Sequence, residues 1–373
     1  MLYELLRSLQ GTLPGATLVN YVSFRAAAAV LFAFGIAIFL GARFIPWVRR
    51  IGLGEDTSKT DSAQLAELHK GKKDTPTMGG LFLVGAMLIA GLLWMRFDGV
   101  HRYSLLGLFL VMWFGAVGLL DDWIKMRVPG AHGLSKRAKQ GLLTVGAVAV
   151  GFLLTHFAGL EDQRGGPQLY FPFIKDASVD LTWALGIPFL LLAILVLTGS
   201  ANAVNLTDGL DGLAIGCVAI ATIALGFITY FVGDVRLSEY LRIVHVPGAS
   251  EMSVLMGALL GASLGFLWYN AAPALVFMGD VGSLALGGAL GYAALVSRTE
   301  LVLLIVGGVF VAEALSVIVQ VLSFKATGRR IFRCAPLHHH FQFGGVPESR
   351  LVVRIWVISA LLALSSVAVF KVR

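Results

Sequence analysis

Charged side chains are scarce in this chain of 373 residues, at 14% against 57% hydrophobic residues. So low a charge content is not that of a water-soluble protein. Only two cysteines are present, Cys217 and Cys334, which excludes a disulfide framework and a repeated cysteine metal-ligand pattern. The apolar segments are also not the alternating stretches of about 10 residues that form transmembrane β-barrels. These absences leave a helical integral membrane protein.

Continuous apolar runs of about 20 residues, the length that spans a bilayer as a helix, recur along the whole chain. We expect membrane spans near residues 22–47, 77–97, 103–120, 140–159, 182–201, 212–233, 252–268, 283–298, 301–324 and 351–370. The 44 glycines favour close helix packing and broken helix ends in this setting. The sequence therefore predicts an all-α integral membrane protein with about ten transmembrane helices, forming a single polytopic domain over residues 1–373.

Lysine and arginine accumulate in alternate connections between these spans. The connections after the first, third and ninth spans are the richest, with Arg49, Arg50, Lys59, Lys70, Lys72, Lys73, Lys125, Arg127, Lys136, Arg137, Lys139, Lys325, Arg329, Arg330, Arg333 and Arg350. Short loops rich in these residues stay in the cytoplasm, so both termini are predicted to face the outer side. Topology and anionic lipids account for the net charge of +7, and we expect no nucleic-acid partner.

Five aspartates lie where apolar runs end, and the span count places all of them on the cytoplasmic side: Asp121, Asp122, Asp208, Asp211 and Asp280. Carboxylates are costly in hydrocarbon, so acids gathered at one end of several spans indicate a specific site. A cation that bridges a phosphate is the first candidate. Two structural alternatives stay open, because Asp121 and Asp122 could be a solvated helix end and Asp280 could cap the following helix.

Two further polar segments are predicted on the same side. Residues 202–212 read Asn-Ala-Val-Asn-Leu-Thr-Asp-Gly-Leu-Asp-Gly and contain no lysine or arginine, which favours a helix end that curls around a ligand. Thr75 and Pro76 precede the second span. They could cap and begin that helix, or they could face a phosphate together with the lysines before them.

The ninth span and the connection after it add four more candidates. His338, His339 and His340 are consecutive, and adjacent positions seldom converge on one zinc ion, so hydrogen bonding to phosphate fits them better. Glu313 lies deep within the span. It could be a functional carboxylate or a partner in interhelical pairing.

Taken in order, these motifs closely resemble the phospho-N-acetylmuramoyl-pentapeptide transferase family, within the polyprenyl-phosphate N-acetylhexosamine-1-phosphate transferase superfamily. The resemblance rests on Thr75-Pro-Thr-Met-Gly-Gly80, Asp121-Asp122, Asn202-Ala-Val-Asn-Leu-Thr-Asp-Gly-Leu-Asp-Gly212, Phe277-Met-Gly-Asp-Val-Gly-Ser283 and Pro336-Leu-His-His-His340. It implies transfer of phospho-MurNAc-pentapeptide from its UDP carrier to undecaprenyl phosphate, which gives lipid I and UMP in peptidoglycan synthesis. It also implies a Mg²⁺-dependent homodimer in the bacterial inner membrane, with its active site facing the cytoplasm.

The resemblance further implies residue roles on the connections near residues 48–76, 121–139, 202–211, 269–283 and 325–350. The catalytic positions are Asp121, Asp122, Asp280, His339, His340 and Lys139, with Asp280 as the Mg²⁺ ligand. The substrate-binding positions are Lys70, Thr75, Asn202, Asn205, Asp208, Asp211, Asn270, Phe277 and His338. Lys136 and Arg137 compete with Lys139 for its place.

Two other functions remain as alternatives. A polyprenyl-phosphate GlcNAc-1-phosphate transferase shares the acidic framework, but the motifs at 75–80 and 336–340 favour the muramoyl enzyme. An ion-coupled transporter would use intramembrane acids such as Glu313, whereas most acids here lie on one face. For a transferase we expect direct attack by the lipid phosphate rather than a covalent phosphosugar-carboxylate intermediate.

Overall fold

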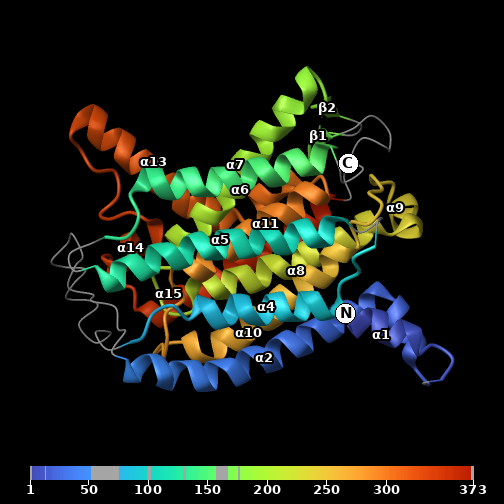
Figure 1. Ribbon diagram of the computed structural model, residues 1–373. Coiled ribbons are helices and arrows are strands. Elements are labelled where there is room, and N and C mark those ends of the chain that lie inside the picture. Colours follow the sequence, from blue (N-terminus) through green and yellow to red (C-terminus); the bar gives the residue numbers. More distant parts are fainter. Residues whose placement is uncertain are drawn as a thin grey trace.

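The computed structural model describes residues 2–12, 14–51, 75–98, 102–128, 132–156, 167–174 and 177–370. In these ranges long helices run side by side in a bundle (Figure 1). The apolar helices are α2 (Val22–Arg50), α4 (Gly80–Trp94), α5 (Arg102–Arg127), α6 (Lys136–His156), α7 (Ile187–Thr207), α8 (Leu213–Gly233), α10 (Glu251–Asn270), α11 (Gly279–Val296), α13 (Gly308–Thr327) and α15 (Glu348–Phe370). All of these except α4 are long and apolar enough to cross a membrane, which confirms a multi-pass helical membrane protein.

Most predicted spans differ from the observed helices by a few residues at their ends, and α5 extends to Arg127 and α7 to Thr207, beyond the predicted ends at 120 and 201. Two predicted spans differ more strongly. The second has only the 15 residues of α4, about 22 Å at 1.5 Å per residue. It begins at Gly80 with Gly79 as its N-cap, so the alternative in which Thr75 caps this helix and Pro76 begins it is wrong. The ninth predicted span is broken at Gly307 into α12 (Glu300–Val306) and α13. Figure 1 shows α13 leaving the bundle at an angle.

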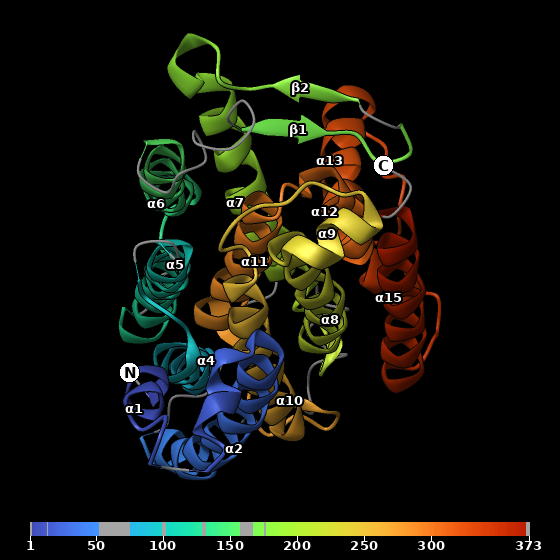
Figure 2. The ribbon, with the colours of Figure 1, turned by 90° about the vertical axis from the view of Figure 1, so that its right-hand side faces the viewer.

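Helix α11 occupies the centre of the bundle, and viewed along the helices it is surrounded by α4, α5, α7, α8 and α10 (Figure 2). Its glycines explain how the neighbours come so close. A Cβ at Gly287 would lie 2.4 Å from the carbonyl oxygen of Ser200 on α7. Small residues let helix backbones approach in this way, as the glycine content predicted.

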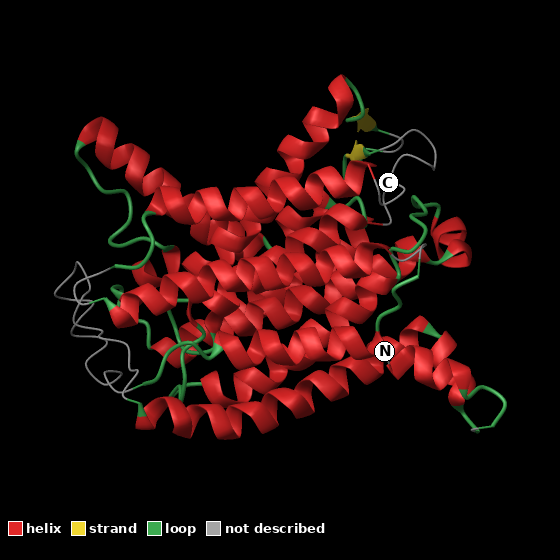
Figure 3. Cartoon of the chain, viewed as in Figure 1, coloured by secondary structure: helices red, strands yellow, loops and turns green. Residues whose placement is uncertain are grey.

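Short helices and strands lie at the ends of the bundle (Figure 3). They are α1 (Leu2–Ser8), the 3-10 helices η1 (Ala16–Asn20) and η5 (Ala184–Gly186), α9 (Val235–Leu241) and α14 (Leu337–Gln342). A hairpin of β1 (Gln168–Tyr170) and β2 (Ser178–Asp180) pairs Leu169 with Val179 and is an addition to the all-α prediction. Strands of three residues are too short for their alternation to be recognised in sequence. Cys217 and Cys334 are both free.

One ion pair is completely buried at the end of the bundle where α2 and α10 begin. The guanidinium of Arg25 donates to both carboxylate oxygens of Glu251, at 2.6 and 2.5 Å, and neither side chain is exposed. Arg25 also donates to the carbonyl oxygen of Trp94, and the backbone N–H of Arg96 donates to Glu251. The pair therefore joins α2, α10 and the end of α4, a connection that the sequence did not reveal.

We expect Arg25→Met to lower the free energy of unfolding by about 3–5 kcal/mol, because it leaves the Glu251 carboxylate buried without its partner. Asp98→Asn is the control, since it removes the charge of the part-exposed Arg96–Asp98 pair at 2.8 Å, worth at most about 1 kcal/mol. Unfolding of the purified protein in mixed micelles with rising SDS measures both. Equal losses for the two variants would contradict the structural role of the buried pair.

Candidate active site

Three aspartates that are far apart in the sequence meet at one end of the bundle. Oxygens of Asp121, Asp122 and Asp280 all lie within 4.8 Å of one another. Asp121 and Asp122 are in the last turns of α5, and Asp280 is in the first turn of α11. Their exposed fractions are 1%, 4% and 9%. We call this group the acidic cluster.

Two lysines compensate the repulsion within the acidic cluster. The Nζ atom of Lys125 lies 2.7 Å from Asp121 Oδ2, 3.3 Å from Asp122 Oδ1 and 3.0 Å from Asp280 Oδ2. Lys139, at the start of α6, pairs with Asp280 and lies 3.3 Å from Asp121. Three carboxylates against two ammonium groups leave one negative charge when all five are ionised. Cations this close favour the ionised carboxylates, whereas burial of the carboxyl groups opposes ionisation.

The structure distinguishes Lys139 from its competitors and adds a residue that the sequence analysis missed. Lys136 and Arg137 are exposed and make no ion pair with the acidic cluster, whereas Lys139 does. Lys125 was not predicted as a site residue. Its spacing was the available signal, because residues three and four apart on a helix are neighbours, and Lys125 follows Asp122 and Asp121 by these intervals.

The backbone around the acidic cluster fixes the carboxylates. The N–H of Leu134 donates to Asp121 Oδ1 at 2.8 Å, and the N–H of Val281 donates to Asp122 Oδ2 at 3.2 Å. Asp122 thus satisfies an N–H in the first turn of α11, as a capping side chain does. The predicted alternative that Asp280 caps this helix was wrong. The N-cap is Met278, and Asp280 lies inside the first turn.

Asn205 contacts the acidic cluster. Helix α7 continues to Thr207, so Asn202 and Asn205 lie on a helix and not in a loop. The Nδ2 atom of Asn205 donates to Asp280 Oδ1 at 2.6 Å and to Ser283 Oγ at 2.8 Å. Asn202 instead donates to Gln140 Oε1 at 3.0 Å. The substrate-binding role of both asparagines stays a prediction.

The connection between α7 and α8 is tied to the connection before α11. Asp211 accepts from the N–H of Ala274 at 3.0 Å, and Asn270 accepts from the N–H of Gly212 at 3.0 Å. Both of these side chains are buried, while Asp208 is half-buried. Asp211 and Asn270 therefore hold the two connections together. Nucleotide binding by Asp208, Asp211 and Asn270 stays a prediction.

The segment at residues 75–80 is hydrogen-bonded through its backbone to the start of the motif at residues 277–283, which contains Asp280. Three backbone hydrogen bonds of 2.8 Å join them: Phe277 N–H to Pro76 O, Gly79 N–H to Phe277 O, and Gly80 N–H to Met278 O. A Cβ at Gly80 would lie 2.2 Å from the nitrogen of Gly282, so both motifs need glycine at this crossing. Phe277 and Thr75 are half-buried. Substrate binding by these two residues stays a prediction. Lys70 lies outside the described residues.

The three histidines fall on α14 and make different contacts. His338 is buried, and its backbone N–H lies 3.2 Å from both carboxylate oxygens of Glu313. His339 Nδ1 lies 3.0 Å from Gln342 Oε1, and His340 Nδ1 accepts from the N–H of Arg333. Glu313 on α13 thus contacts α14, in agreement with the alternative of interhelical pairing. Phosphate binding by the histidines remains a prediction.

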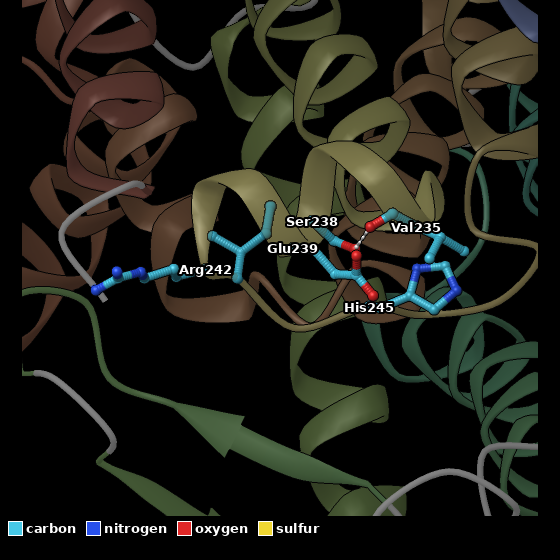
Figure 4. Close-up of a pocket in the computed structure, with 6 residues that line it drawn as sticks. Val235, Ser238, Glu239, Arg242 and His245 are labelled. Atoms are coloured by element: carbon cyan, nitrogen blue, oxygen red, sulfur yellow. Dashed lines mark hydrogen bonds between the residues drawn. The ribbon is translucent and has the colours of Figure 1, made fainter.

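A surface pocket lies away from these residues. It is lined by Val235, Ser238, Glu239, Arg242, Ile243 and His245, on α9 and the segment after it (Figure 4). Helix α9 follows the far end of α8, whose first end adjoins Asp211. The pocket is therefore at the end of the bundle opposite the acidic cluster and is not the chemical site.

A multi-pass helix bundle with a buried carboxylate and lysine cluster at its end indicates a membrane protein with a functional site for a charged ligand. Comparison with known proteins narrows this class. Residues 104–298, which contain the whole acidic cluster, match glycosyl transferase family 4. Residues 72–84 match phospho-N-acetylmuramoyl-pentapeptide-transferase signature 1. The protein is a membrane phosphosugar transferase.

Curated relatives align over their entire length with the entire chain. They include phospho-N-acetylmuramoyl-pentapeptide-transferases of Oleidesulfovibrio alaskensis, 44% identical, Maridesulfovibrio salexigens, 45% identical, and Pelobacter propionicus, 44% identical. Each alignment covers 100% of both chains. The chain belongs to the phospho-N-acetylmuramoyl-pentapeptide-transferase family.

Gly118 on α5 provides a test of how the acidic cluster is positioned. A Cβ at Gly118 would lie 2.2 Å from the carbonyl oxygen of Asp280, so Gly118→Ala should push the start of α11 away from α5. We expect transferase turnover to fall roughly 100-fold, as for a displacement of about 1 Å among reacting groups. Gly141→Ala on α6, where a Cβ meets open space, should retain wild-type turnover. Wild-type turnover in both variants would refute this positioning role.

Proposed function

We propose that the protein transfers phospho-MurNAc-pentapeptide from its UDP carrier to undecaprenyl phosphate, giving lipid I and UMP. The observation that carries the proposal is the full-length identity of 44–45% to transferases of this name. The signature match at residues 72–84 supports the muramoyl substrate over the GlcNAc-1-phosphate alternative. The gathering of acids at one end of the bundle, with lysines among them, supports group transfer over ion-coupled transport.

The acidic cluster is also where a Mg²⁺ ion would bind. Carboxylate oxygens are the donors that Mg²⁺ prefers, and three carboxylates within 4.8 Å of one another fit this requirement. We propose Asp280 as the principal ligand, with Asp121 and Asp122 beside it. When bound, Mg²⁺ would neutralise the diphosphate and stabilise the leaving UMP.

We further propose direct transfer. An oxygen of the lipid phosphate attacks the β-phosphorus of the UDP substrate, and the bond from that phosphorus to UMP breaks. The contacts of Asp280 support this route, because Asn205, Lys125 and Lys139 already engage its oxygens. A carboxylate held by that many donors is a poor free nucleophile. Lys125 and Lys139 would instead stabilise negative charge on the transferring phosphoryl group.

We place the acidic cluster on the cytoplasmic face of the bacterial inner membrane. The connections at its end of the bundle are rich in lysine and arginine, which favours the cytoplasmic side. The N-terminal α1 and the end of α15 are both at the opposite end of the bundle (Figure 1), which would then be the outer side. A soluble nucleotide and a lipid phosphate can both reach a site at the membrane edge. We retain the homodimer as part of the proposal.

The proposed reaction is tested with radiolabelled UDP-MurNAc-pentapeptide or UDP-GlcNAc, each offered with undecaprenyl phosphate. We expect release of UMP and a labelled lipid from the muramoyl substrate alone. Chelation by EDTA should stop the reaction, and added Mg²⁺ should restore it, because the diphosphate charge would otherwise stay unneutralised. No UMP from the muramoyl substrate would refute the proposed function.

Substitutions of Asp280 and Asp211 should change different kinetic constants. Asp280→Asn removes a charge that faces two lysines and the proposed metal, and we expect kcat to fall on the order of 100- to 1,000-fold. Asp211→Asn keeps an oxygen that can accept from Ala274, so it should mainly raise the KM for the UDP substrate. Steady-state kinetics separate the two effects. The same defect in both variants would contradict this division of roles.

A further inference from the structure

Glu313 is a buried carboxylate in the second turn of α13, and the reaction proposed above does not use it. It is 3% exposed. Both of its oxygens lie 3.2 Å from the backbone nitrogen of His338, and Oε2 lies 3.2 Å from His338 Nδ1. A carboxylate is costly in an apolar helix of this kind, so its retention there indicates a specific task. Its contacts point to the orientation of His338.

The opposite edge of the His338 ring is packed against Gly209. A Cβ at Gly209 would lie 2.3 Å from His338 Nε2, so no other residue fits there without displacing the ring. Neither ring nitrogen has a hydrogen-bond partner among the described residues, so the 3.2 Å approach of Nδ1 to Glu313 Oε2 is a close contact, and the ring is fully buried. The imidazole is therefore held between Glu313 and the backbone of Gly209. This contact links α13 and α14 to the connection between α7 and α8.

Gly209 lies between Asp208 and Asp211, in the segment expected to face the nucleotide. The remainder of that segment is held by Asn270 and by the contact of Asp211 with Ala274. The acidic cluster, in contrast, is held by Lys125, Lys139 and Asn205, through contacts that do not include Glu313. A substitution of Glu313 should therefore shift the Asp208–Asp211 segment more than it shifts the acidic cluster.

We propose that Glu313 is a positioning residue for the nucleotide end of the substrate. By fixing the backbone and the ring of His338, it seats the imidazole against Gly209 and sets the position of the Asp208–Asp211 segment relative to the histidines. This inference rests on the proposed function, since it names a nucleoside diphosphate as the ligand of that segment. It assigns Glu313 no contact with the substrate.

The test compares Glu313→Gln with the wild-type full-length protein in detergent. Separate titrations give the KM for the UDP substrate and the KM for undecaprenyl phosphate, and calorimetry gives the affinity for UMP. We expect the KM for the UDP substrate to rise at least tenfold, UMP binding to weaken by a similar factor, and the KM for the lipid to stay within twofold. Gly209→Ala should shift the same constants in the same direction, because its methyl group would displace the His338 ring.

Two controls isolate positioning from stability. Glu251→Gln changes a buried glutamate at the far end of the bundle and should lower the thermal midpoint with both KM values unchanged. Gly199→Ala on α7, where a Cβ meets open space, should behave as wild type. If Glu313→Gln behaves like Glu251→Gln, or raises both KM values equally, the positioning role is refuted. Should Glu313→Gln fail to fold, Gly209→Ala decides by the same criteria.

Failure of this inference is distinguishable from failure of the proposed function. A wild-type protein that releases UMP from the muramoyl substrate, combined with an unchanged KM in both Glu313→Gln and Gly209→Ala, removes the role of Glu313 and leaves the function standing. A wild-type protein that releases no UMP removes the proposed function itself.

Discussion

Mutual repulsion among three carboxylates buried within a few ångströms of one another is the constraint that organises the active end of this bundle. Such a group is stabilised by protonation of a carboxylate or by positive charge that lies equally close. Lys125 supplies it from the same helix as Asp121 and Asp122, and Lys139 supplies it from α6. The positions of α5, α6 and α11 are therefore coupled through charge as well as through apolar packing.

Glycine makes this arrangement sterically possible. Gly118 lets α5 approach the backbone of Asp280, and Gly133, with φ of 88°, lets the segment before α6 turn over Asp121. Gly80 and Gly282 allow the signature segment to cross the start of α11. Each contact needs the absence of a Cβ, so the glycine content that indicated close packing has specific uses at the site.

The buried charged groups at the two ends of the bundle differ in how their charges are matched. Arg25 and Glu251 are matched in bidentate geometry, because the guanidinium donates to both carboxylate oxygens. The acidic cluster has three carboxylates for two ammonium groups, so its charged groups are not matched one to one. The matched pair therefore serves the assembly of helices, whereas the acidic cluster groups three carboxylates that could hold a metal ion.

By itself the sequence determined the class of fold, the approximate spans and the gathering of the aspartates at one end, because apolar run length and lysine-arginine asymmetry are local properties of the chain. It also carried the family motifs. Only the tertiary structure decided that Lys139 and not Lys136 joins the acidic cluster, that Gly80 and Gly307 set helix boundaries, and that Glu313 contacts His338. These outcomes depend on contacts between helices distant in sequence, such as the 159 residues that separate Asp122 from Val281, and no local pattern encodes such contacts.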